Sequence, residues 1–121
     1  MDYKRILIVD KNEISLDLLR HSVQQMGSDY QIVSAKNGFA ALVQLFARRF
    51  DLLIAAEQLH GIDGMELARL SRRISPGTHV VLITEHNIDQ AQARARQQHL
   101  TLDGYLSKPF TFMQLSKVVK G

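Results

Sequence analysis

The sequence predicts an α/β domain with a doubly wound, five-stranded parallel sheet and five helices. Short apolar runs alternate with segments whose apolar residues recur at helical spacing, and this alternation repeats five times along the chain. Three of the runs end directly before a polar residue, which is Asp10, Thr84 or Lys108. Because parallel strands joined by right-handed crossovers all end at one edge of the sheet, we expect these three side chains to share a crevice.

The first two strand and helix pairs are indicated by apolar patterns and turn residues. A strand over residues 5–9 is followed by Asn12, the expected N-cap of a helix that Gly27 ends. A second strand over residues 30–35 leads through a turn at residues 36–38 into the second helix. The residues expected on the buried faces of these helices are Ile14, Leu18, Leu19, Val23, Ala41, Leu42, Leu45 and Phe46.

The next two strands are expected over residues 51–56 and 79–83. The second of them is almost purely apolar, as in a strand that is covered on both faces. The helix between them begins at Gly64 and ends at the Ser-Pro-Gly sequence of residues 75–77. Its inward residues are expected to be Leu67, Leu70 and Ile74.

The remaining elements are a helix at about residues 88–98, a strand at residues 105–107 and a final helix. The apolar residues of the first are mainly alanines, so it should bury little area and dock weakly. The final helix still has a helical pattern where it reaches Gly121, which fits either a natural end or a fragment of a longer regulator. Core positions are expected for Ala91, Ala93, Ala95, Phe112, Leu115, Val118 and Val119, and for Met26, Met65 and Met113.

Composition narrows the class of protein. Residues 1–121 suffice for one globular domain, with 45% hydrophobic and 22% charged residues. The absence of cysteine excludes a disulfide scaffold, and the polar start of the chain predicts neither a signal peptide nor a membrane span, so a cytoplasmic protein is expected. The net charge of +3 is spread over dispersed arginines without interleaved aromatic residues, so nucleic acid is expected only through an attached domain.

Four segments carry polar residues in an order typical of one family. They are ILIVD at residues 6–10, DLLI at 51–54 with GIDGMEL at 61–67, LIT at 82–84 and GYLSKPF at 104–110. Together they resemble the receiver domain of bacterial two-component response regulators, the CheY-like superfamily with a flavodoxin-like (βα)5 fold. The resemblance implies a domain that accepts a phosphoryl group on an Asp, from a phosphohistidine or a small phosphodonor, beside a magnesium ion.

The acceptor position of that family falls on Ala56. In the family the Asp lies eight residues before the Gly of the Asp-Gly pair, here Gly64, and five after the Asp that opens the strand, here Asp51. A methyl group has no lone pair with which to attack phosphorus. The resemblance therefore implies a degenerate pseudo-receiver that lacks the phosphoacceptor and is not an enzyme.

The other pocket positions are partly altered. The acidic pair of the family is Asp10-Lys11 here, and a lysine repels Mg²⁺, so we expect no metal or other cofactor. By the resemblance, Thr84 and Lys108 match the residues that contact phosphoryl oxygens, and Tyr105 matches the switch aromatic. An ion pair between Lys108 and Asp10 would hold the pocket in one state.

Several alternatives stay open at this point. An active receiver with an atypical acceptor would use Asp10 or Glu57. Glu57 could also mimic phospho-Asp, although strand alternation should turn it away from Ala56. A flavin, nucleotide or small-anion module on the same architecture lacks a glycine-rich loop after the first strand. The five histidines show no metal-ligand spacing.

The favoured hypothesis is a phosphorylation-independent module for protein interaction or dimerisation in two-component signalling. Its partner would be a protein or an attached output domain, such as a histidine kinase, or a second copy of the chain. The resemblance places the common interaction face on the fourth helix, fifth strand and fifth helix. Residues expected there are Arg94, Arg96, Gln97, Tyr105 and Lys117.

Overall fold

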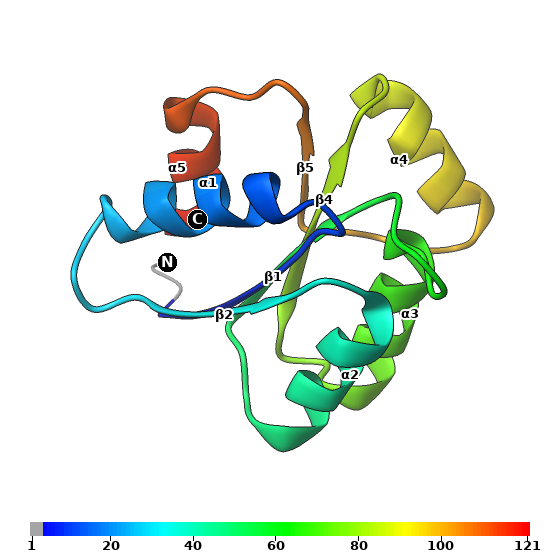
Figure 1. The fold of residues 1–121 in the computed structure, drawn as a ribbon. Coiled ribbons are helices and arrows are strands. Elements are labelled where there is room, and N and C mark those ends of the chain that lie inside the picture. Colours follow the sequence, from blue (N-terminus) through cyan, green and yellow to red (C-terminus); the bar gives the residue numbers. More distant parts are fainter. Residues whose placement is uncertain (1–3) are drawn as a thin grey trace.

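A parallel sheet of five strands, in the order β2-β1-β3-β4-β5, forms the middle layer of the protein (Figure 1). The structure is a computed structural model that describes residues 4–121, so residues 1–3, part of the polar start noted above, lie outside the described residues. The strands are β1 (Arg5–Val9), β2 (Gln31–Ala35), β3 (Leu52–Ala56), β4 (His79–Thr84) and β5 (Gly104–Ser107).

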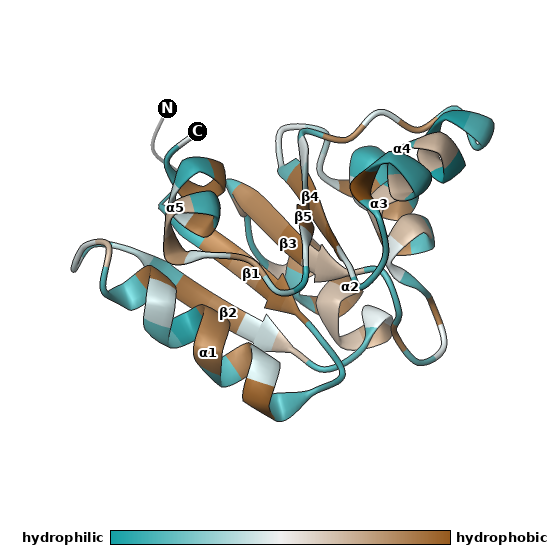
Figure 2. Ribbon diagram, turned by 90° about the horizontal axis from the view of Figure 1, so that it is seen from above, coloured by the Kyte–Doolittle hydropathy of each residue, from teal (hydrophilic) through white to brown (hydrophobic). Residues whose placement is uncertain are grey.

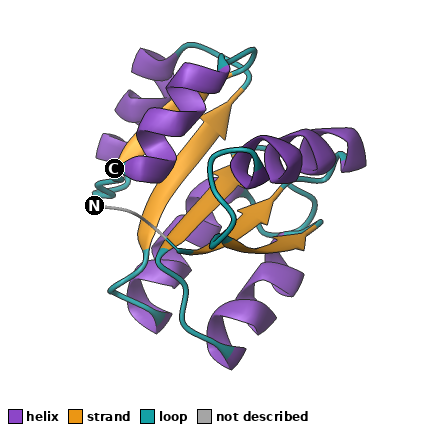
Figure 3. Cartoon of the chain, turned by 90° about the vertical axis from the view of Figure 1, so that its left-hand side faces the viewer, coloured by secondary structure: helices purple, strands orange, loops and turns teal. Residues whose placement is uncertain are grey.

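Helices cover both faces of the sheet, which confirms the predicted doubly wound α/β fold (Figure 3). On one face lie α1 (Glu13–Gln24) and α5 (Phe112–Lys120). On the other lie α2 (Gly38–Ala47), α3 (Gly64–Ile74) and α4 (Ile88–Gln97). Within residues 4–121, no helix is long and apolar enough to cross a bilayer.

Side chains of the strands contribute to two hydrophobic cores, one under each helical layer. Alternate side chains of β1 point to opposite faces, so that Ile6 and Ile8 join the core beneath α1 and α5, while Leu7 and Val9 join the other. β3 is buried along its whole length. Full burial of a Leu or Ile side chain contributes about 1.5–3 kcal/mol, so this packing strongly favours one strand register.

Each helix begins at a side chain that caps its first turn. These side chains accept a hydrogen bond from a backbone N–H two or three residues further on. The prediction that Asn12 is the N-cap of the first helix is confirmed. The five caps are Asn12, Asn37, Asp63, Asn87 and Thr111. At the other end of α1, the C-cap is Gln25, so the helix ends before Gly27 and that prediction was wrong.

The predicted buried face of α1 was wrong at two positions. Leu19 and Val23 are buried together with Leu16, but Ile14 and Leu18 are 71% and 64% exposed. A helix that packs on a sheet buries one stripe along its length, and the sequence of α1 contains more apolar residues than that stripe accommodates.

The same limit explains the other exposed apolar residues. Phe46, Phe112 and Met113 are 73%, 47% and 67% exposed, and Ala93 is exposed on α4, so none of the four fills the core as predicted. Met65 is buried in the core beneath α2, α3 and α4, and Met26 packs partly buried against the core beneath α1 and α5. Surplus apolar residues on α2 and α5 therefore remain at the surface.

Candidate functional site

The carboxyl ends of β1, β3, β4 and β5 meet at one edge of the sheet, where a crevice of about 220 Å³ opens. Four of the residues singled out in the sequence line it, and Thr84 lies fully buried beside it at the end of β4. The four are Asp10, Lys11, Ala56 and Lys108. The other lining residues are Asn12, Ser15, Glu57, Gln58, Ile83 and Glu85.

Ala56 is the last residue of β3 and is 6% exposed in the crevice. The backbone around it is tightly packed, because the N–H of Gly64 at the start of α3 donates to the carbonyl of Glu57 over 2.8 Å. A Cβ atom on Gly64 would lie 2.3 Å from the carbonyl oxygen of Ala56. β3 therefore presents a methyl group at the crevice, and only a glycine at position 64 lets α3 begin so close to it.

Lys108 reaches across the crevice from the loop after β5 to Asp10 at the end of β1. Its Nζ donates to Asp10 Oδ2 over 2.9 Å and to Ser15 Oγ over 3.2 Å. Asp10 Oδ1 accepts a 3.0 Å hydrogen bond from the backbone N–H of Asn12. The side chain of Asp10 is 4% exposed and that of Lys108 27%, so solvent screens this ion pair only partly.

Thr84 is engaged by the carboxylate of Glu57. Thr84 Oγ1 donates to Glu57 Oε1 over 2.8 Å and accepts from the backbone N–H of His86 over 3.0 Å. The expectation that Glu57 faces away from this region was wrong. Glu57 follows the last residue of β3, so the alternation of a strand no longer governs its direction, and its side chain lines the crevice together with Ala56.

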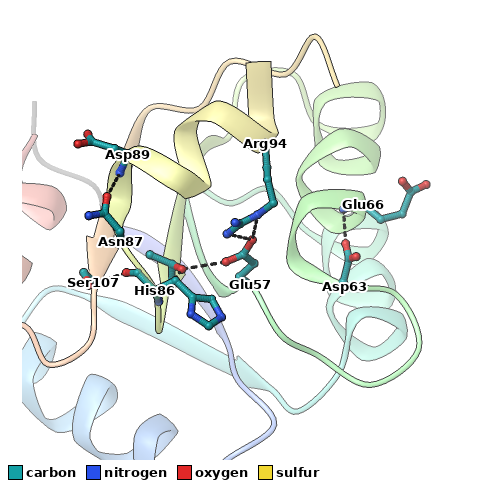
Figure 4. A network of polar contacts seen from close by, with 9 residues as sticks. Glu57, Asp63, Glu66, His86, Asn87, Asp89, Arg94 and Ser107 are labelled. Carbon is teal, nitrogen blue, oxygen red and sulfur yellow. Dashed lines mark hydrogen bonds and ion pairs between the residues drawn. The ribbon is translucent and has the colours of Figure 1, made fainter. Parts of the chain in front are cut away.

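Glu57 also links the sheet to α4. Arg94 Nε donates to Glu57 Oε2 over 2.8 Å, and the two side chains meet in Figure 4 between the end of β3 and α4. The backbone N–H of Glu57 donates to the carbonyl of Ile83 over 2.7 Å. The Glu57 side chain is 14% exposed, so its charge depends on Arg94 for compensation.

Tyr105 lies half-buried on β5, near the same group of charges. Burial raises the pKa of its hydroxyl, Arg96 opposes that rise, and the charge of Glu57 adds to it. Tyr105, Arg96 and Glu57 are therefore electrostatically coupled, whereas the role of Tyr105 as a switch stays a prediction.

Two positions of the crevice, Lys11 and Ala56, bring no side-chain oxygen for a metal ion. Mg²⁺ requires several oxygen ligands in near-octahedral geometry. Asp10 contributes one carboxylate, which already contacts Lys108 and Asn12, while Ala56 has no side-chain oxygen and Lys11 brings a positive charge. In the described part of the chain, no three His, Cys, Asp or Glu side chains are grouped so that they could hold a metal.

Sequence reasoning missed two members of the site, Ser15 and Arg94. Ser15 lies three residues after the cap Asn12, which places it in the first turn of α1 facing the strand ends, so its position was accessible from the pattern. Arg94 gave no signal as a partner of Glu57, because only the docking of α4 brings two residues so far apart in sequence together.

Comparisons with known proteins agree with this geometry. The family model of the response regulator receiver domain matches residues 6–120. The chain is 30% identical over 120 residues to the sensor histidine kinase GacS of Pseudomonas protegens, a match that covers 95% of this chain and 13% of the kinase. The chain thus spans a small part of that relative.

Two solved structures share the fold over nearly the whole chain. A CheY-like receiver domain from Methanospirillum hungatei JF-1 has a TM-score of 0.84 and 23% identity, covering 96% of this chain and 90% of its own. The response regulator TrrA of Thermotoga maritima, solved in complex with Mg²⁺-BeF, has a TM-score of 0.82 and 31% identity, covering 96% of each chain. From the family match and this shared fold, the chain belongs to the response regulator receiver domain family of two-component signalling.

Proposed function

We propose that this chain is a pseudo-receiver, which works without phosphorylation and without catalysis of its own as a protein-interaction module in two-component signalling. The observation that carries the proposal is Ala56 at the end of β3 in the crevice. In the receivers that the chain resembles, an Asp at this place attacks phosphorus, and a methyl group has no electron pair to do so.

The contacts of Lys108 and Thr84 support a crevice that holds one arrangement without a phosphoryl group. By the resemblance, these two residues bind phosphoryl oxygens in a working receiver. Here Lys108 is paired with Asp10, and the hydroxyl of Thr84 donates a hydrogen bond to Glu57. Both donors have carboxylate acceptors within the chain, so no external anion is needed to satisfy them.

The alternative acceptors are less favourable. Asp10 is in an ion pair with Lys108, and Glu57 is in an ion pair with Arg94. A cation in contact with a carboxylate draws electron density from it, so each ion pair lowers the nucleophilicity of its carboxylate. Lys11 and Ala56 offer no oxygen ligand for Mg²⁺, the ion that assists phosphoryl transfer in the resembled receivers. We therefore propose that the chain has lost specific magnesium binding.

Phosphorylation is tested directly by intact mass. The purified chain is incubated with acetyl phosphate and MgCl₂, beside an ordinary receiver that carries the acceptor Asp. We expect the control to gain one acid-stable, base-labile phosphoryl group and this chain to gain none. A stoichiometric, Mg²⁺-dependent gain in this chain would overturn the proposal, and peptide mapping would then show whether Asp10 or Glu57 is the acceptor.

We further propose that the module acts in the cytoplasm on a protein partner or an attached output domain, such as a histidine kinase. Support comes from GacS, a sensor kinase of which the matched region is a small part. On the face of α4, β5 and α5, Arg96, Gln97 and Lys117 are exposed, and α5 also exposes Phe112 and Met113. A homodimer through this face would place like charges together. We therefore expect its dissociation constant, measured by sedimentation equilibrium, to be larger at low salt than at high salt, where the charges are screened.

A further inference from the structure

α2 differs from the other helices in carrying no charged residue. Three of its apolar side chains are exposed, Phe39 and Val43 by 64% each and Phe46 by 73%. They lie at positions i, i+4 and i+7, so they follow one line along the outer face of the helix. Figure 2 shows where α2 lies beside the sheet, coloured by hydropathy. We call these three residues the α2 stripe. A helix that is apolar on its outer face as well as its inner one is normally covered by another element.

The α2 stripe ends beside two exposed arginines, Arg48 and Arg49. Phe46, Arg48 and Arg49 line the same hollow of about 660 Å³ at the end of α2. Both arginine side chains are exposed, and neither has an ion pair within residues 4–121. Asp51 also lines the hollow, but its carboxylate accepts from the backbone N–H groups of Lys4 and Arg5 over 3.2 and 2.9 Å. The surface therefore combines an apolar line with two arginines and one carboxylate, so its net charge is positive.

Two kinds of partner could cover the α2 stripe, a second copy of the chain or a single helix of another protein, and these features favour the helix. A second copy would bring its own Arg48 and Arg49, so two copies that meet at this end of α2 would place four cations together. Two largely uncovered aromatic side chains of roughly 150–250 Å² each also fall short of the roughly 800 Å² per partner in a standard protein interface. A single helix needs less surface and anchors through residues at i, i+4 and i+7.

We infer that the α2 stripe, together with Arg48 and Arg49, docks an amphipathic helix whose apolar face is flanked by carboxylates. Phe39, Val43 and Phe46 bury the apolar face of the partner, while Arg48 and Arg49 pair with its acidic residues and fix its direction. This inference rests on the proposed role as a protein-interaction module, but it does not depend on the loss of phosphorylation.

The test uses two synthetic helical peptides that share leucines at i, i+4 and i+7 and differ in carrying Glu or Lys beside them. Binding to the full chain is measured by fluorescence anisotropy at low salt. We expect saturable binding of the Glu peptide, at least about tenfold weaker binding of the Lys peptide, and a similar loss for the Glu peptide with Phe46→Gln or with Arg48→Glu combined with Arg49→Glu. Met113→Gln, which changes a side chain 67% exposed on the opposite face, is the matched control and should bind as the parent does.

Three outcomes would overturn the inference. They are no saturable binding of the Glu peptide, equal binding of both peptides, or a loss of binding with Leu18→Gln on α1 instead of with Phe46→Gln. A dimer in sedimentation that Phe46→Gln dissolves would assign the α2 stripe to a second copy. Phe46 is 73% exposed, so circular dichroism should show the variant folded. The acetyl phosphate assay does not involve the α2 stripe. A failure of the proposed loss of phosphorylation can therefore be told apart from a failure of the helix-docking inference.

Discussion

The hydroxyl of Thr84 donates a 2.8 Å hydrogen bond to the carboxylate of Glu57, across the ends of β4 and β3. Through the second oxygen of Glu57 the contact continues to Arg94 on α4 (Figure 4). A fully buried hydroxyl on the sheet is thus connected to a surface helix by one carboxylate. These two contacts couple the position of α4 to the strand ends, because a movement of α4 would leave a buried polar group without its partner and so cost free energy.

Thr84→Val should destabilise the fold because it keeps the shape of the side chain but leaves Glu57 without its donor. We expect the free energy of unfolding to fall by about 1–3 kcal/mol in urea titrations. Thr101→Val, at an exposed position, is the control and should stay within about 0.5 kcal/mol. In a double-mutant cycle with Glu57→Met, which has no oxygen acceptor, strictly additive losses would contradict a direct contact in solution.

Lys108→Met should be costly because it leaves the buried carboxylate of Asp10 without a cation. The pair is not fully buried, so we expect a loss below the roughly 3–5 kcal/mol that breaking a fully buried ion pair costs, yet above about 1 kcal/mol. Lys36→Met is the matched control, since it removes an ion pair to Glu13 whose side chains are 62% and 69% exposed. Exposed pairs contribute about 0–1 kcal/mol, so similar losses in both variants would argue against the crevice pair.

Gly64→Ala tests the close approach of α3 to the end of β3. The new Cβ would lie 2.3 Å from the Ala56 carbonyl oxygen and 2.8 Å from the Cα of Glu57, so backbone must move. We expect a loss of at least about 2 kcal/mol in urea unfolding. For Gly77→Ala, where a Cβ meets nothing within 4 Å, stability should be unchanged or higher by about 0.4–1 kcal/mol. A harmless Gly64→Ala would show that this packing is loose.

Tyr105 gives a prediction for alkaline pH. Burial raises the pKa of its hydroxyl above the ordinary tyrosine value of 10.0, with Arg96 opposing and Glu57 reinforcing the rise. The unfolded chain then ionises first, so the contribution of neutral Tyr105 is complete below pH 10 and is lost as the pH rises through the folded-state pKa. Between pH 10 and that folded-state pKa, the parent should lose stability more steeply than Tyr105→Phe in urea titrations. Parallel curves for the two proteins would contradict the raised pKa.

Ala56→Asp tests which part of the crevice limits phosphoryl transfer. The single change supplies a nucleophile, but Lys11 still places a positive charge where Mg²⁺ would bind. We expect no stoichiometric gain of a phosphoryl group from acetyl phosphate by intact mass. Combining Ala56→Asp with Lys11→Asp adds oxygen donors beside Asp10 and should produce an Mg²⁺-dependent gain. Full labelling of the single variant would show that Lys11 is no obstacle.

The strand ends were predictable because two simple regularities act together. Apolar periodicity located each strand to within one residue, and parallel topology then placed Asp10, Ala56 and Lys108 at one edge. The ion pair between Lys108 and Asp10 follows from that placement with little further information. In contrast, periodicity did not separate Leu16 from Ile14 and Leu18, because more apolar residues lie on α1 than one buried stripe holds.

By itself, the sequence determined the fold class, the order of the elements and the methyl group at position 56, since these depend on local patterns and residue identity. Only the tertiary structure decided that Glu57 turns to Thr84 and Arg94, and that Phe39, Val43 and Phe46 stay uncovered. The physical reason is that a side chain beyond a strand end, or on the outer face of a helix, takes its direction and its neighbours from the packing of distant elements.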